Sequence, residues 1–352
     1  MSVTRKDIAI HTGLSASTVG MILSGRGQRY SEATRTRVLE AAEELNYRVD
    51  PAARSLRLNR SFLLGVLINA GNTGIAAEFL RGVQNALIDG DYAPTVFSHG
   101  NRDEEAESLR RCIDRRIDGL VANIAINPHG EAQLARYAAL DAHDIPVVEV
   151  FGRFLPGVTK VNVDYEAAGR AAARHLIDRG HRRIAMLTHH RYTASADRAA
   201  GPHYDAWERY CGYRECMLEA GLEPVVVTHD LSREIDVDDE FYHGGEVSLR
   251  VLLAHPARPT AVICYNDLQA YGLIRAARQQ QIDLPRQLSI VGYGDAEVSR
   301  ITSPALTTLK IPAFEVGRSA AATLLELIEK RTVEDQLIQS KLIVRESTGE
   351  LS

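Results

Sequence analysis

The chain has 352 residues, of which 45% are hydrophobic and 25% charged, a composition typical of soluble globular proteins with two or three domains. No run of residues reaches the ~18 uninterrupted apolar positions that a membrane-spanning helix needs. The N-terminal sequence MSVTRKDIAI also lacks the apolar stretch of a signal peptide. These features exclude a membrane protein and favour a cytoplasmic location.

The distribution of charge is more informative than its total. The formal charge of −5 argues by itself against nucleic-acid binding. However, residues 1–60 carry ten Lys and Arg against six Asp and Glu, whereas the remaining residues carry 31 against 40. This asymmetry predicts a basic head that meets phosphates and an acidic body that does not. The four cysteines show neither zinc-ligand spacing nor a disulfide framework, so we expect reduced thiols.

Residues 4–45 predict three short helices. Thr4, Ser15 and Ser31 are residue types that cap helix N-termini, and apolar side chains follow each of them at helical spacing. Gly13 can adopt the positive φ that a tight turn between the first two helices requires. Two helices joined in this way are typical of a helix-turn-helix, whose second helix enters the major groove of DNA.

The second helix and the loop after it supply the expected DNA contacts. Its N-terminal turns would face base edges, and hydroxyl and guanidinium groups around it would meet phosphates. The predicted DNA-contacting residues of this head are Ala16, Ser17 and Met21 for bases, with Ser15, Thr18, Arg26, Arg29 and Thr4 around them. The alternative is a three-helix module that contacts another protein.

Residues 50–60 predict a hinge helix. Asp50-Pro51 is a typical helix start, but the segment that follows is too short to be stable alone, so it should form only against a dimer mate and DNA. Leu56 could wedge between base steps in the minor groove, with the small Ala53 allowing close approach. Arg54 and Arg57 would reach phosphates. An ordinary linker, with Leu56 packed on the core, is the alternative.

From residue 61 onward, apolar strand patterns alternate with helical patterns. The strand patterns of a first series are FLLGVLI, APTVFSH, GLVANI and IPVVEVF, and those of a second are RIAMLT, PVVVTHD, TAVICYN and SIVGYGD. Such alternation predicts doubly wound parallel sheets, and two series predict two lobes of an α/β core. Ligands of such sheets bind beyond the carboxyl ends of the strands, here between the lobes. Asn69, Asn72 and Thr73 follow the first strand and are expected to line that site.

Two other classes of protein compete with a ligand-controlled DNA reader. The sequence does not support an enzyme, because it contains no P-loop, GxSxG or HExxH motif. The glycines near Asn72 also lack the third glycine of a dinucleotide-binding fingerprint. His181, His189, His190 and His203 have no clean ligand spacing. We therefore expect no catalytic residue, cofactor or metal. A solute-binding sensor without specific DNA binding remains the alternative, although the head and the missing signal peptide argue against it.

Several motifs, in order along nearly the whole chain, resemble the LacI/GalR family of bacterial transcription regulators. They are TRKDIA…GLSASTV at 4–19, AEELNY at 42–47, ARSLR at 53–57, HLIDRGHRRIA at 175–185, RPTAV at 258–262, ND at 266–267 and VREST at 344–348. The resemblance implies a homodimer that binds a palindromic operator as a repressor. A small effector, most often a sugar or a nucleobase, would close the lobes and change the hinge.

The resemblance also implies a periplasmic-binding-protein-like core with three crossovers between discontinuous lobes. The expected domains are the helix-turn-helix at 1–49, the hinge at 50–60 and the core at 61–352. Lobe 1 would comprise about 61–160 and 312–332, and lobe 2 about 161–311 and 333–348.

The family's effector residues carry over to particular positions. Arg209 matches the effector-binding arginine and Asn266 the pocket asparagine. The strand-end aspartate falls at Gly294 or Asp295, where many members have two acidic residues, and Asp295 would keep its role. Phe151 replaces a common aspartate and could stack on a sugar ring or make the pocket more apolar. Tyr192 belongs to a long segment, 189–206, that could be a lid or an unliganded surface loop. Met21 stands where an arginine often reads guanine, so the resemblance implies an altered base preference.

Overall fold

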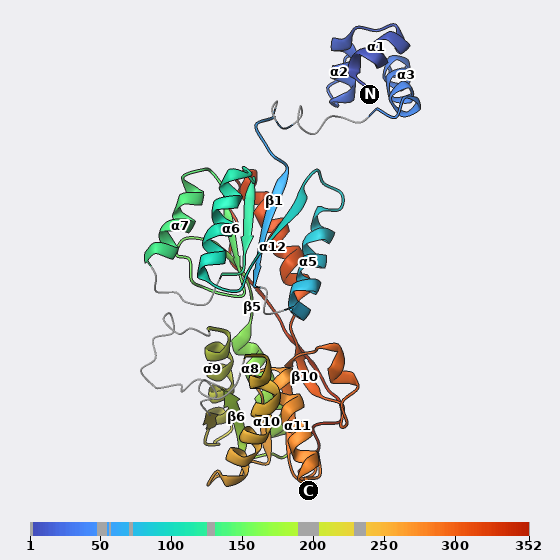
Figure 1. Ribbon diagram of the computed structural model, residues 1–352. Helices are drawn as coiled ribbons and strands as arrows, with labels where there is room; N and C mark the ends of the chain where they lie inside the picture. The colour runs from blue at the N-terminus through green and yellow to red at the C-terminus, as the bar shows by residue number, and fades with distance from the viewer. Residues whose placement is uncertain are drawn as a thin grey trace. The chain divides into compact units, whose positions relative to one another are not determined.

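The computed structural model describes residues 3–47, 55, 58–69, 73–124, 131–188, 204–228 and 237–351. The chain forms two compact units, Met1–Ser61 and Phe62–Ser352. Figure 1 shows the first as a small helical body and the second as two α/β lobes. Among the described residues, no helix is both long enough and apolar enough to cross a membrane.

The first unit contains α1 (Arg5–Thr12), α2 (Ala16–Leu23) and α3 (Glu32–Glu44). Each helix begins at the cap that the sequence predicts. Thr4 and Asp7 form a capping box, and the Ser15 hydroxyl accepts a hydrogen bond from the Thr18 amide at 3.1 Å. Gly13 has a φ of 67°, which allows the sharp turn between α1 and α2. The small core that joins the helices consists of Ile8, Ala9, Val19, Ile22, Val38 and Ala41.

Lobe 1 of the second unit is built on a parallel sheet in the order β11-β5-β4-β3-β1-β2. Its strands are β1 (Leu63–Asn69), β2 (Ala93–His99), β3 (Gly119–Ala122), β4 (Val147–Val150), β5 (Thr159–Val163) and β11 (Gln336–Ile338). Its helices are α5 (Thr73–Leu87), α6 (Arg102–Asp114), α7 (Glu131–Asp141) and α12 (Ala313–Ile328). The central strands β3 and β4 are almost wholly buried, as expected for a parallel sheet with helices on both faces.

Lobe 2 is built on a second sheet in the order β12-β10-β9-β8-β6-β7, in which only β12 is antiparallel to its neighbour. Its strands are β6 (Ile184–Thr188), β7 (Val225–Thr228), β8 (Ala261–Ile263), β9 (Ser289–Gly294), β10 (Thr307–Lys310) and β12 (Lys341–Ile343). Its helices are α8 (Tyr165–Asp178), α9 (Tyr204–Glu219), α10 (Val237–Ala254), α11 (Asp267–Gln279) and the short 3₁₀ helix η1 (Glu297–Arg300). The predicted fold class, a helical head with two doubly wound lobes, is confirmed.

The chain passes between the lobes three times, after β5, after β10 and after β11. The sequence predicts lobe 1 segments that end near residues 160 and 332. The pairing corrects both limits, because β5 pairs with β4 in lobe 1 and β11 pairs with β5 over residues 336–338. An apolar run predicts a strand but not its partner, so the exact crossover points were not evident from the pattern.

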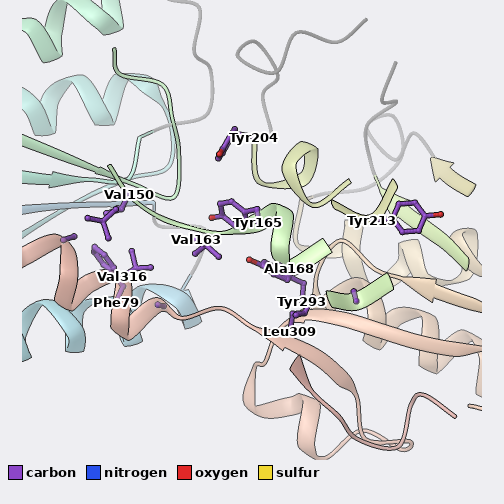
Figure 2. Packing of buried hydrophobic residues seen from close by; sticks show 14 of the residues in the cluster. Phe79, Val150, Val163, Tyr165, Ala168, Tyr204, Tyr213, Tyr293, Leu309 and Val316 are labelled. Carbon is purple, nitrogen blue, oxygen red and sulfur yellow. The ribbon is translucent and has the colours of Figure 1, made fainter. Parts of the chain in front are cut away.

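Helices α8 and α9 of lobe 2 pack with their backbones in close contact. Gly169 of α8 lies against the carbonyl of Arg209 in α9, and Gly212 of α9 lies against the carbonyl of Glu166 in α8, so that a Cβ at either glycine would overlap the facing backbone. A large buried cluster continues from these helices into the sheets of both lobes (Figure 2). The backbone of α9 at Arg209 is therefore held at short range against α8.

Candidate DNA-reading helix and effector site

The first turn of α2 presents an exposed surface. Val19 and Ile22 are buried and anchor the helix to the head, whereas Ser15, Ala16 and Ser17 are exposed. Thr18 and Met21 are half-buried at the edge of the same turn. This arrangement leaves the predicted base-reading side chains accessible, with the hydrophobic side of the helix turned inward.

The predicted phosphate-contacting residues of the head differ in how they are held. Thr4 is exposed, but its hydroxyl donates to Asp7 at 2.7 Å within the capping box. Arg26 is exposed. Arg29 donates to the Tyr30 hydroxyl at 2.8 Å, and this hydrogen bond, followed by one with Thr18, lowers the pKa of that hydroxyl. Tyr30 therefore links Arg29 to α2, a contact that the sequence did not indicate.

Several predicted site residues fall outside the described residues. They are Ala53, Arg54, Leu56 and Arg57 of the predicted hinge, together with Asn72 and Tyr192 of the predicted effector site. Thr73 is the first residue of α5.

One edge of lobe 1 carries polar and aromatic residues at the carboxyl ends of four parallel strands. Asn69 and His99 end β1 and β2, Asn123 follows β3, and Phe151 follows β4 with a φ of 57°. His99 is buried, and its Nε2 lies 2.8 Å from the Asn123 carbonyl oxygen. Its Nδ1 finds no hydrogen-bond partner among the described residues. Phe151 packs edge-on against Phe79 with ring centroids 5.6 Å apart, so its ring belongs partly to the core of lobe 1.

Arg209 lies at the corresponding edge of lobe 2, and its guanidinium is held by several contacts. Its side chain is only 4% exposed. Nη1 donates to the Tyr265 carbonyl oxygen at 2.6 Å, and Nη2 donates to Asp205 Oδ2 at 2.8 Å. The guanidinium carbon lies 4.0 Å from the ring centroid of Tyr293 and 4.9 Å from that of Tyr265. Cation–π contact and hydrogen bonding thus fix the plane of the guanidinium.

Tyrosines continue from Arg209 toward lobe 1. The Tyr165 ring lies 6.4 Å from Tyr293 and 6.1 Å from Tyr204, and Figure 2 shows the three rings following one another. Arg153, in the loop after β4 of lobe 1, places its guanidinium carbon 5.5 Å from the Tyr204 ring centroid. Burial raises the pKa of Tyr165 and Tyr293 well above the ordinary value, so both hydroxyls stay protonated at neutral pH. The cluster offers hydroxyl groups and aromatic faces rather than excess charge.

The other two predicted effector residues of lobe 2 have structural partners. Asn266 is the N-cap of α11, and its Oδ1 accepts from the Gln269 amide at 2.9 Å. Asp295 Oδ1 accepts from Arg345 Nη2 at 2.6 Å in an ion pair whose side chains are 4% and 13% exposed. Arg345 follows β12, just beyond the third crossover. We therefore expect the Asp295 carboxylate to hold this segment to lobe 2.

Asp205, Tyr265 and Tyr293 surround Arg209 but are not among the effector residues predicted from the sequence. Asp205 could have been found, because it stands four residues before Arg209 in a helical pattern and thus on the same helix face. The two tyrosines end separate strand patterns, so only the sheet order brings them together. Within the described residues, no three His, Cys, Asp or Glu side chains lie close enough to hold a metal ion. His181 instead bonds Thr260 and Ser289, each at 3.0 Å.

Comparisons with known proteins agree with this architecture. Residues 4–50 match the model of bacterial regulatory proteins of the lacI family, and residues 173–348 match a periplasmic binding protein-like domain. The Ribose operon repressor of Escherichia coli K12 is 30% identical over 97% of this chain and 98% of its own. The transcriptional repressor PurR of Photobacterium profundum is 29% identical over 99% of both chains.

Solved structures show the same fold. The complex of the transcriptional regulator CelR with cellobiose aligns over 98% of this chain and 99% of its own, with a TM-score of 0.67 and 26% identity. The lac repressor dimer bound to operator and the anti-inducer ONPF aligns over 99% and 100%, with a TM-score of 0.76 and 21% identity. The chain thus belongs to the LacI family of bacterial transcription regulators, DNA-binding repressors with an effector-binding core, and not to a family of enzymes.

Proposed function

We propose that the protein is a cytoplasmic homodimer that binds a palindromic operator and changes its operator affinity when a sugar or sugar derivative binds between the lobes. The observation that carries this proposal is the Arg209–tyrosine cluster at the carboxyl edge of the lobe 2 sheet, in a chain that also presents an exposed helix-turn-helix face. A guanidinium fixed between aromatic rings suits a ligand with both hydroxyls and an apolar face.

In this proposal the exposed turn of α2 reads the operator. Ala16, Ser17 and Met21 approach base edges, and hydroxyls and guanidinium groups at Ser15, Thr18, Arg26 and Arg29 meet phosphates. The hinge residues Ala53, Arg54, Leu56 and Arg57 bind the minor groove, with Leu56 as the wedge that bends the duplex. A bent site would favour operators with a flexible central base step.

The residues proposed for the effector site are Asn69, Asn72, Thr73, Phe151, Tyr192, Arg209, Asn266 and Asp295. The solved complexes of relatives support a sugar: one regulator holds cellobiose, a second from Enterococcus faecium holds ribose, and a third from Weissella paramesenteroides holds glucose. Phe151 and the tyrosines provide ring faces of the kind on which pyranose and furanose rings stack.

An exposed apolar patch in lobe 2 supports the homodimer. Leu268, the second residue of α11, is 55% exposed, and Ile301, directly after η1, is 81% exposed. The Asp267 carboxylate accepts from the Ala296 amide and the Ser299 hydroxyl, each at 2.9 Å, which places η1 beside the start of α11. Exposed apolar residues on adjoining elements favour burial against another protein surface, and in a symmetric dimer the same surface serves both subunits.

The proposal is tested by selecting binding sites for the full chain from a random duplex library, with and without a cell metabolite extract. We expect a palindrome with a flexible central step, and enrichment that the extract strengthens or weakens. Enrichment only with the extract would identify a corepressor. Failure to enrich any sequence under either condition would contradict operator binding and favour a sensor without specific DNA binding.

Two head variants sharpen that selection. Ala16→Asp adds a carboxylate to the exposed first turn of α2 and should abolish enrichment, because it would face the negative charge of DNA. Leu39→Asp, on an exposed position in the middle of α3, is the matched control and should leave the selected sequence unchanged. Equal loss in both variants would mean that α2 is not the reading helix.

A further inference from the structure

Asp205 is bound to Arg209 within α9. It lies one helical turn before the arginine, so the two side chains share a face of the helix. The Asp205 carboxylate accepts from Nη2 at 2.8 Å, and its main-chain carbonyl accepts from Nε at 3.2 Å. Together with the bond from Nη1 to the Tyr265 carbonyl oxygen, each nitrogen of the guanidinium donates a hydrogen bond inside lobe 2.

We propose that Asp205 sets the charge preference of the effector site, so that the protein binds an uncharged, hydroxyl-bearing effector in preference to an anionic one. This inference rests on the proposed function, because it assumes that the effector binds beside Arg209. It narrows the class of effector that binds beside Arg209, because a guanidinium alone would suit a carboxylate or phosphate as well as a hydroxyl.

The charges of the cluster are balanced before any effector enters. The Asp205 side chain is 27% exposed, whereas the guanidinium behind it is almost completely covered. An incoming carboxylate would meet the Asp205 carboxylate at short range, and like charges at that distance repel strongly in a site of low dielectric. Farther along the tyrosines, the Arg153 guanidinium lies over the Tyr204 ring, and the carboxylates of Glu208, Asp164 and Glu166 contribute negative charge around the same tyrosine.

Buried polar groups beside the cluster indicate which groups of an effector it can bind. The Gln269 side-chain nitrogen is buried without a hydrogen-bond partner among the described residues, and the buried Tyr293 hydroxyl has the Ser340 side chain beside it. Tyr293 stacks on Arg209, and the Gln269 side-chain oxygen accepts from the Tyr265 amide at 2.8 Å, so both groups adjoin the cluster. A neutral hydroxyl can accept from these groups and also donate to Asp205, whereas a carboxylate can accept from them but cannot donate.

The competing account is that an effector carboxylate displaces Asp205 from Arg209. In that case Asp205 would pair with Arg209 only in the ligand-free protein. Asp205 stands in the first turn of α9, where the helix dipole favours a negative charge, so a displaced carboxylate would stay beside the anionic ligand. The two accounts differ in the wild type, because displacement predicts that the wild type already prefers the acid, whereas our proposal predicts that it prefers the neutral sugar.

The test is calorimetric titration of the full chain with three matched pairs in which both members keep the pyranose ring: glucose and glucuronate, galactose and galacturonate, mannose and mannuronate. We expect the wild type to prefer a neutral sugar to its acid by at least about tenfold. Asp205→Asn keeps the shape of the side chain and should shift that ratio toward the acid by about tenfold or more. If the protein binds none of the six, the variant should still gain a measurable affinity for an acid.

Controls keep the result decisive. Glu215→Gln removes another acidic side chain of α9, which pairs with Arg170 at 2.9 Å on the face toward α8, and should leave the ratio unchanged. Asp205→Ala repeats the test if the asparagine variant does not fold. A wild type that prefers an acid, or Asp205 variants that gain no affinity for any acid, would overturn the proposal. The titration contains no DNA, so it tests the charge preference separately from operator control. If the Asp205 variants bind the acids better but none of these ligands changes operator affinity, this inference is supported and the proposed function is contradicted.

Discussion

At the scale of single residues, burial decides the role of a charged side chain. The Asp295–Arg345 and Asp114–Arg110 pairs have the same separation of 2.6 Å. The first pair is nearly buried, whereas both side chains of the second are more than half exposed. An exposed pair gains little because water already solvates both charges, but a buried charge that loses its partner is strongly destabilising.

We therefore expect Asp295→Asn to lower the free energy of unfolding by about 3 kcal/mol, because the Arg345 guanidinium would keep its burial and lose its countercharge. Urea denaturation measures this change, and Asp114→Asn should leave the urea midpoint unchanged. The same variants report on the site. A large loss of effector affinity in Asp295→Asn at full stability would show that this carboxylate binds the effector and does not serve lobe 2 alone.

Single residues also show where sequence reasoning succeeds. Thr4, Ser15 and Ser31 are caps in the structure because an N-cap depends only on the residue itself and the next three amides. The partner of Asp295 could not be predicted in this way, because Arg345 stands 50 residues away in the sequence. Resemblance to a family indicated that Asp295 lies near a strand end, but it could not indicate which group holds its carboxylate.

At the scale of elements, the contact between α8 and α9 determines where Arg209 lies. Gly169→Ala would place a Cβ against the Arg209 carbonyl, so α8 and α9 would have to move apart. We expect a loss of about 2–3 kcal/mol in the free energy of unfolding, as in other overpacked cores. Thermal and urea denaturation would measure it, and effector titration should show weaker binding because Arg209 moves with its helix.

Gly90→Ala is the control for that substitution. A Cβ at Gly90 would come no closer than 3.6 Å to the Leu87 carbonyl oxygen, which is an ordinary contact. Its effect should stay within about 0.5 kcal/mol, as for most surface substitutions. Equal destabilisation by the two alanines would show that the close approach of α8 and α9 is not what limits the space at Gly169.

At the scale of the whole molecule, sequence patterns predict the series of elements better than their pairing. The alternation of apolar strands and helices predicts two doubly wound lobes because each strand pattern is local. The sheet that receives Gln336–Ile338 depends on pairing with Thr159–Val163, about 175 residues earlier, and no local pattern encodes that choice. The effector cluster has the same origin, since Arg209, Tyr265 and Tyr293 come from three separate parts of the chain.

Two buried histidines connect the start of lobe 2 to the end of the chain. His175 Nε2 lies 2.9 Å from the Thr348 hydroxyl, and its Nδ1 lies 3.0 Å from Arg179 Nη1. Since a guanidinium only donates, Nδ1 must accept and the ring must be neutral. Burial, with a smaller contribution from the Arg179 charge, lowers the pKa of His175 to about 4, and burial also lowers the pKa of His181, which bonds the Gly349 carbonyl.

These pKa values predict a loss of stability in mild acid. The folded-state pKa of His175 lies below the unfolded value of about 6.5, so its contribution is complete above pH 6.5 and declines as the pH falls toward 4. The expected loss from this residue over that interval is on the order of 3 kcal/mol. Urea denaturation between pH 7 and 4 measures this loss.

Two variants test the assignment to His175. His175→Asn should be less stable than the wild type at pH 7 but should lose less free energy of unfolding on acidification. His143→Asn, at an exposed position, should follow the wild type. Parallel pH profiles for the wild type and His175→Asn would mean that the acid sensitivity of lobe 2 has another source.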